Sequence, residues 1–182
     1  MRRLLLLLLF IAAPLAAQTV HFDFETGDLQ GWKVVEGEFE KPVVDLVSPY
    51  RTGERINKQG RYFLSTLGAT AATAADKHTG VIESPVFELA GTKMSFLVGG
   101  GKGDKTRVEL CEAESGRALL SAGGPNTKYM RRVNWNVGKL KGRKLFVRVV
   151  DESTGGFGHV TFDDFSTEGK IDAKATTRRP KE

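Results

Sequence analysis

The sequence has a single cysteine, and beyond residue 17 it has no long apolar run. One cysteine excludes an internal disulfide and a cysteine-based zinc site, and we interpret Cys111 as a small side chain within a strand. A membrane-spanning helix needs roughly 20 apolar residues, so we expect no membrane span. The 27 Lys and Arg residues are mixed with 22 Asp and Glu residues rather than gathered on one helix face, which argues against a nucleic-acid partner.

Motifs of several enzyme classes are also missing. The Gly-x-Ser-x-Gly turn of α/β-hydrolases does not occur. The glycine-rich segment Gly99–Asp104 lacks the residue order of a phosphate-binding loop, and no EF-hand spacing is present. We therefore predict a protein without catalytic residues. A small glycan hydrolase or lyase, acting through a carboxylate pair or a His/Tyr/Arg set, is the enzymatic alternative.

Residues 1–17 have the order of a signal peptide. Arg2 and Arg3 precede the apolar stretch Leu4–Ala13, and small residues lead to a cleavage site before Gln18. We predict that the protein is secreted or periplasmic. An uncleaved membrane anchor is the alternative, but the apolar stretch is short for a membrane span.

Alternation of apolar and polar residues dominates the rest of the chain, and turn residues separate short runs. This pattern predicts an all-β fold, a two-sheet antiparallel β-sandwich of the jelly-roll type, over residues 18–166. Residues 167–182 lack aromatics and are predicted to form a flexible basic tail. The expected strands are Val20–Glu25, Trp32–Gly37, Arg61–Leu67, Gly80–Leu89, Lys93–Val98, Thr106–Ala113, Ala118–Ala122, Tyr129–Trp135, Lys144–Asp151 and His159–Ser166.

Acidic residues alternate with aromatics at both ends of the predicted sandwich. Asp23 and Glu25 lie in the first strand region, and Asp163 and Asp164 lie in the last. Pairing of the two strands would gather carboxylates, which are the ligands that Ca²⁺ prefers. Neighbouring Asp163 and Asp164 point to opposite faces, so only one can enter a given site unless the strand bulges. The alternative is that the acids cap turns and keep edge strands soluble.

A ligand site built from loops is predicted at one rim of the sandwich. Asp151 ends one strand and His159 begins the next, so a hydrogen bond between them would present His159 and Phe157 to a ligand. Arg51 lies in a polar loop suited to binding hydroxyl groups, and the glycines near Gly100 would let a sugar approach the backbone. The alternative for Asp151 and His159 is a structural lock of the hairpin.

Arg148 and two tryptophans leave alternatives open. Arg148 shares a strand face with apolar residues, so its head either reaches water or lines a sugar groove. Trp32 fits a core position, whereas Trp135 suits either the core or a sugar-stacking surface.

An ordered set of segments resembles β-sandwich modules of the galactose-binding-like kind that are associated with levanases and related fructan hydrolases. The resemblance covers roughly Phe22 to Phe165. One departure is Phe157, where these modules often carry Trp. The segments are Phe22–Trp32, Gly60–Leu67, Thr79–Phe87, Ser95–Gly101, Val149–Asp151 and Gly155–His159.

The resemblance implies a jelly-roll module that binds carbohydrate, including a fructan-like glycan, and carries a structural calcium. Together with the residue patterns, it predicts an exported, noncatalytic carbohydrate-binding module. The predicted ligand residues are Arg51, Asp151, His159, Arg148 and Phe157, and the predicted metal residues are Asp23, Glu25, Asp163 and Asp164. A structural or adhesion module that binds a protein or the cell envelope is the second candidate.

Overall fold

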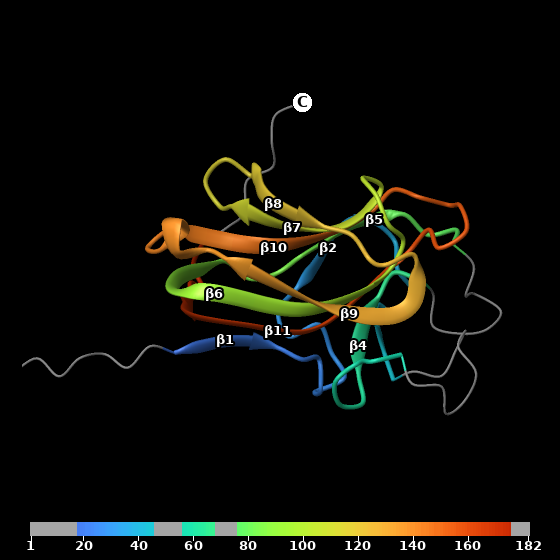
Figure 1. The fold of residues 1–182 in the computed structure, drawn as a ribbon, viewed down its shortest axis with the longest axis horizontal. Coiled ribbons are helices and arrows are strands. Elements are labelled where there is room, and N and C mark those ends of the chain that lie inside the picture. The colour runs from blue at the N-terminus through green and yellow to red at the C-terminus, as the bar shows by residue number, and fades with distance from the viewer. Residues whose placement is uncertain (1–17, 46–55, 68–75, 176–182) are drawn as a thin grey trace, which may run out of the picture.

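The chain folds as an all-β antiparallel sandwich (Figure 1). The computed structural model describes residues 18–45, 56–67 and 76–175. Within these ranges the one helical element is a 3-10 turn, η1 (Gly138–Leu140), and no helix could cross a membrane. The predicted fold class is confirmed. The strands are β1 (Thr19–Phe22), β2 (Lys33–Gly37), β3 (Val43–Val44), β4 (Phe63–Ser65), β5 (Gly80–Glu83), β6 (Phe87–Gly100), β7 (Thr106–Glu112), β8 (Ala118–Ala122), β9 (Thr127–Asn136), β10 (Lys144–Asp151) and β11 (Val160–Ile171).

The strands form two layers that meet at one corner. One layer has the order β8-β7-β10-β5-β2, and the other is β9-β6-β11, with β1 and the β4-β3 pair on the far side of β11. The start of β6 pairs with the start of β10, which joins the layers along one edge. On the opposite edge, β8 and β9 each have one strand partner among the described residues, so the sandwich is open between them.

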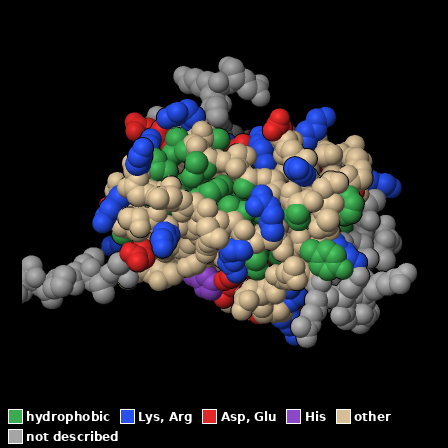
Figure 2. Space-filling model, viewed as in Figure 1, with side chains coloured by type: hydrophobic (Ala, Val, Ile, Leu, Met, Phe, Trp, Pro, Cys, Tyr) green, Lys and Arg blue, Asp and Glu red, His purple; other side chains and the backbone are tan. Residues whose placement is uncertain are grey.

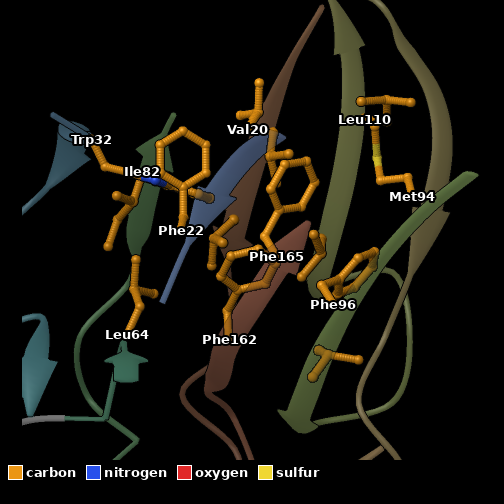
Figure 3. Packing of buried hydrophobic residues seen from close by; sticks show 14 of the residues in the cluster. Val20, Phe22, Trp32, Leu64, Ile82, Met94, Phe96, Leu110, Phe162 and Phe165 are labelled. Atoms are coloured by element: carbon orange, nitrogen blue, oxygen red, sulfur yellow. The ribbon is translucent and has the colours of Figure 1, made fainter. Parts of the chain in front are cut away.

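The core between the layers combines a cluster of aromatic rings with a larger number of aliphatic side chains (Figure 3). Trp32 is 3% exposed, as its predicted core position requires. Its ring lies 5.2 Å from that of Phe162 and 5.4 Å from that of Phe22, centre to centre. Removing one of these rings should cost about 3–5 kcal/mol, because a buried aromatic leaves a cavity that the packed layers cannot fill.

Most strand predictions agree with the structure, and the differences have local causes. Ala118–Ala122 and Lys144–Asp151 agree residue for residue. The predicted strand Gly80–Leu89 is wrong because it breaks before Pro85, which has no N–H to donate. The residues after the break instead begin the 14-residue strand β6. The short strand β3 had no sequence signal.

The predicted end of the sandwich at Ser166 is too early, because β11 continues to Ile171. Thr167 is buried, and its hydroxyl donates to the Lys93 carbonyl at 2.9 Å. Beyond the strand, the Asp172 N–H donates to the Val86 carbonyl at 2.8 Å. Backbone pairing of this kind needs no aromatic side chain, so composition gave no sign of it.

Candidate ligand groove

Asp151 lies beneath the surface, away from the predicted ligand position. It is fully buried, and its carboxylate accepts hydrogen bonds from the Thr66 hydroxyl at 2.5 Å and the Ser153 N–H at 3.2 Å. Burial raises its pKa from 3.8 to about 7. β10 is paired on both sides at this position, with Thr106 and Gly80 opposite, so the residue lies inside the layer rather than at its edge.

The predicted hydrogen bond between Asp151 and His159 is wrong. His159 Nδ1 lies 2.7 Å from a carboxylate oxygen of Asp76, which is distant in sequence and was missed. The His159 side chain is nearly enclosed, and burial lowers its pKa although the nearby Asp76 opposes that shift. The pair fits a structural lock rather than a ligand contact.

Arg148 contacts carboxylates rather than water or an open groove. It is 9% exposed, and neighbouring strands place Glu83 and Glu109 directly beside it. Its guanidinium donates to Glu83 Oε1 at 2.9 Å, to Glu109 Oε2 at 3.4 Å and to the Gly116 carbonyl at 3.2 Å. These partners occupy the donors that a sugar would need, which contradicts its predicted ligand role.

The remaining predicted ligand residues give a mixed result. Phe157 is 40% exposed, and its ring centre lies 6.1 Å from that of His159. Gly100 has a φ of +89°, and a Cβ there would overlap the His159 carbonyl oxygen. The glycine therefore admits the protein's own backbone rather than a ligand. Arg51 lies outside the described residues.

The acid-rich ends of the sandwich do meet, because β1 pairs with β11. Asp164 nevertheless belongs to a surface network. Its carboxylate lies 3.1 Å from His21 Nε2 and 2.5 Å from an Arg132 nitrogen. Asp23 accepts a hydrogen bond from the Gln30 amide at 2.8 Å. Both carboxylates thus have hydrogen-bond partners on the protein surface, and their predicted role as metal ligands stays a prediction.

Glu25 and Asp163 instead face the loop that precedes β4. Asp163 is fully buried and accepts from the Gln59 N–H at 2.7 Å, and burial raises its pKa to about 7. Glu25 accepts from the N–H groups of Arg61 and Tyr62, each at 2.8 Å.

The two neighbouring aspartates separate because β11 bulges at this point. Asp164 has a φ of +46°, and the register with β6 shifts between Asp163 and Ser166. In the described ranges, no three His, Cys, Asp or Glu side chains cluster as a metal site would require.

A groove that sequence reasoning missed lies on the open side of the sandwich, between β8 and β9. Figure 2 shows hydrophobic side chains gathered there, with Lys and Arg side chains around them. Its volume is about 860 Å³, within the range of ligand sites. The lining residues are Lys102, Gly103, Asp104, Ser121, Ala122, Gly123, Gly124, Pro125, Arg131, Arg132, Val133, Asn134 and Trp135.

Trp135 borders this groove while it remains anchored to the core. It pairs with Met94 in register, and its ring packs edge-on against that of Phe96 at 4.8 Å. Arg131 projects from the same face of β9, and its guanidinium donates to the Gly123 carbonyl at 2.8 Å, which ties the strand to the β8–β9 loop. The core holds Trp135 on one side, and its ring is only partly buried.

A second, polar groove of about 660 Å³ crosses the outer face of β1, β11, β6 and β9. Serine, threonine and amide side chains dominate its lining, including Ser95, Asn134 and Ser166. The alternation of Arg131, Val133 and Trp135 was visible in the sequence. Their position opposite β8 was not, because it depends on how the two layers close.

Comparison with known proteins supports the β-sandwich fold but does not show the expected link to levanase modules. No family model matches the chain. It is 30% identical over 89 residues to the "Putative glycosyl hydrolase ecdE" of Aspergillus rugulosus, a match that spans 48% of this chain but 12% of that protein.

Two solved structures with the same fold are adhesin domains of Lys-gingipain from Porphyromonas gingivalis W83. The K1 domain has a TM-score of 0.53 at 17% identity and covers 86% of this chain and 99% of its own. The K3 domain has a TM-score of 0.51 at 13% identity, with coverage of 82% and 98%.

A third similar structure is TmCBM61 in complex with β-1,4-galactotriose, with a TM-score of 0.49 at 21% identity and coverage of 82% and 94%. The two adhesin domains establish a shared β-sandwich architecture and nothing finer. The expected link to levanase modules stays a prediction.

Proposed function

We propose that the protein is a noncatalytic carbohydrate-binding module whose site is the groove between β8 and β9. The observation that carries the proposal is Trp135, a fixed and partly buried ring that lies among hydrogen-bonding groups. A sugar ring has an apolar face of C–H groups and an edge of hydroxyl groups. An aromatic ring that shares a strand face with a guanidinium donor, that of Arg131, matches both.

The groove chemistry favours binding over hydrolysis. Glycoside hydrolysis ordinarily uses two carboxyl groups that flank the scissile bond. The described lining contains one carboxylate, Asp104. The buried Asp151 and Asp163 have raised pKa values but do not line this groove.

The local match to ecdE supports a role connected with sugars. The matched part is a small fraction of a protein whose name describes a glycosyl hydrolase. A segment of that relative size suits an accessory module better than a catalytic domain. The fructan-like glycan that the resemblance implies remains one candidate ligand among carbohydrates.

The test compares two aromatic residues of the same strand. Trp135→Ala should weaken binding to the best ligand of a glycan array by about tenfold or more, because it removes the stacking surface. Tyr129→Ala is the matched control, since Tyr129 is 44% exposed on β9 but does not line the groove. Trp135→Phe, which keeps the packing on Phe96, and a melting curve separate lost binding from lost fold.

Equal binding by the Trp135 and Tyr129 variants would place the site elsewhere. Absence of binding to every glycan, fructans included, would refute the proposed function itself. In that case the structural or adhesion candidate would be preferred.

We further propose that Glu25 and Asp163 are the acids that would hold the calcium implied by the resemblance. Their oxygens face one loop, and Asp163 is a buried carboxylate whose pKa burial raises, which a divalent cation would neutralise. Calcium should then raise the melting temperature, and Asp163→Asn should abolish the increase. Asp164→Asn, which changes the neighbouring surface network, should leave it intact.

Export is proposed from residues 1–17 alone. Mass spectrometry of the protein recovered from its natural host should show Gln18 at the N-terminus. A stable full-length, membrane-bound species would contradict this proposal.

A further inference from the structure

We infer that the groove between β8 and β9 selects an acidic sugar chain, one that carries carboxylate or sulfate groups. This inference rests on the proposed function and specifies its ligand class. The lining contains three cations, Lys102, Arg131 and Arg132, and one carboxylate, Asp104. Because Asp164 already pairs with Arg132, two cations remain against one carboxylate, and this surplus of positive charge favours an anionic ligand over a neutral one.

Two of the three cations have charge left to offer. Arg132 is already held by the Asp164 carboxylate at 2.5 Å. Arg131 donates to a neutral carbonyl, that of Gly123, and Lys102 is exposed. Neither forms an ion pair with a carboxylate in the part of the chain that the structure describes. An anionic group that reached Arg131 would form a charge-assisted hydrogen bond, which is stronger than a bond to a neutral hydroxyl.

The apolar and cationic groups follow one another along the groove. Arg131 and Trp135 lie four residues apart on one face of β9, which is roughly 13 Å along an extended strand. Beyond Arg131, Gly123 lies close to Gly103, which follows Lys102 in the chain. A chain with one ring on Trp135 would therefore present acidic groups further along to Arg131 and then Lys102.

The experiment compares sugars that differ in charge and share a backbone. Calorimetry would measure binding of an oligogalacturonate, the same oligomer with methyl-esterified carboxyls, a sulfated galactan oligomer and its neutral counterpart. We expect the acidic forms to bind at least tenfold more tightly than the neutral ones, with affinity that falls as salt rises. The galacturonate and sulfate arms show which acidic group is preferred.

Matched variants assign the charge effect to the groove. Arg131→Gln and Lys102→Gln should each reduce binding of the preferred acidic sugar by about tenfold, a larger loss than for its neutral counterpart, and a melting curve for each variant separates lost binding from lost fold. Lys170→Gln removes an exposed cation from β11, outside the groove, and should change nothing.

The outcomes separate the two proposals. Equal binding of esterified and acidic oligomers would overturn the acidic preference and leave the proposed function standing. Absence of binding by all four sugars, while a ligand of the glycan array is still bound, would also overturn the acidic preference and leave the proposed function standing. Equal losses in the Arg131 and Lys170 variants, or equally tight binding of a single-stranded oligonucleotide, would mean non-specific charge attraction and would overturn the inference.

Discussion

The Asp151→Asn variant should be less stable than the natural protein at low pH and more stable at high pH. The carboxyl group is fully buried, and its pKa rises from 3.8 to about 7 in the folded protein. Because the folded state binds this proton more tightly, the free energy of unfolding falls as pH rises from about 4 to 7. Each pKa unit corresponds to about 1.4 kcal/mol, so the loss above pH 7 approaches about 4 kcal/mol at most.

The asparagine side chain of the Asp151→Asn variant cannot ionise, but it also loses one acceptor. Thr66 and Ser153 contact different oxygens of the carboxyl group, whereas an amide has a single oxygen, and the hydrogen bond that it cannot replace is worth about 1 kcal/mol. The variant should therefore be about 1 kcal/mol less stable than the natural protein at pH 5. At pH 8 it should be about 1–3 kcal/mol more stable, because the buried charge is gone.

Urea unfolding at pH 5 and pH 8 measures both values. Asp163, whose pKa burial also raises to about 7, will leave part of the natural pH dependence in the variant. Glu114→Gln removes an exposed carboxylate and serves as the control. An equal loss of stability at both pH values would show that Asp151 keeps one protonation state over this range, and the reasoning from burial would fail.

Three further predictions follow from the described contacts. Arg148→Met should lower the free energy of unfolding by about 3–5 kcal/mol, measured by urea unfolding, because Glu83 and Glu109 would each lose a buried ion pair, although Glu109 keeps the one with Arg107. A change below about 1 kcal/mol would contradict the importance of the Arg148 ion pairs. Gly100→Ala should lower the melting temperature because its φ is +89° and a Cβ would meet the His159 carbonyl, and an unchanged temperature would contradict this. Truncation after Ser166 should prevent cooperative thermal unfolding because it removes the end of β11. Normal melting of the truncated protein would show that the sandwich ends at Ser166, as the sequence predicted.

The sequence contained enough to predict the sandwich, because alternation and turns are local. The strand Lys144–Asp151 follows from a short run of apolar, mostly β-branched residues that ends at a polar turn. The predicted ligand site failed for a different reason. Asp151 and His159 are polar residues at strand ends, and only the packed structure shows that Thr66 and Asp76 enclose them. Their polar side chains suggested a role in ligand binding, whereas their burial in the folded protein gives them a structural role.

The groove between β8 and β9 could not be predicted from the sequence either. Trp135 was recognised as either core or surface, and both descriptions hold, since the ring packs on Phe96 and also borders the groove. Its exposure depends on β8 and β9 having no further strand between them in the described chain. Which strands remain at an edge is a property of the whole topology, and no local pattern encodes it.

The pairing of β1 with β11 has a consequence for how the chain folds during synthesis. β1 is made well before its partner β11, because the pairing joins Thr19 to Glu168 across most of the described chain. Until β11 is available, the ring of Phe22 cannot reach that of Phe165, which lies 5.7 Å away in the folded protein. Contacts so distant in sequence form slowly, because a long loop must close first. A growing chain therefore cannot complete this side of the sandwich until β11 has been made.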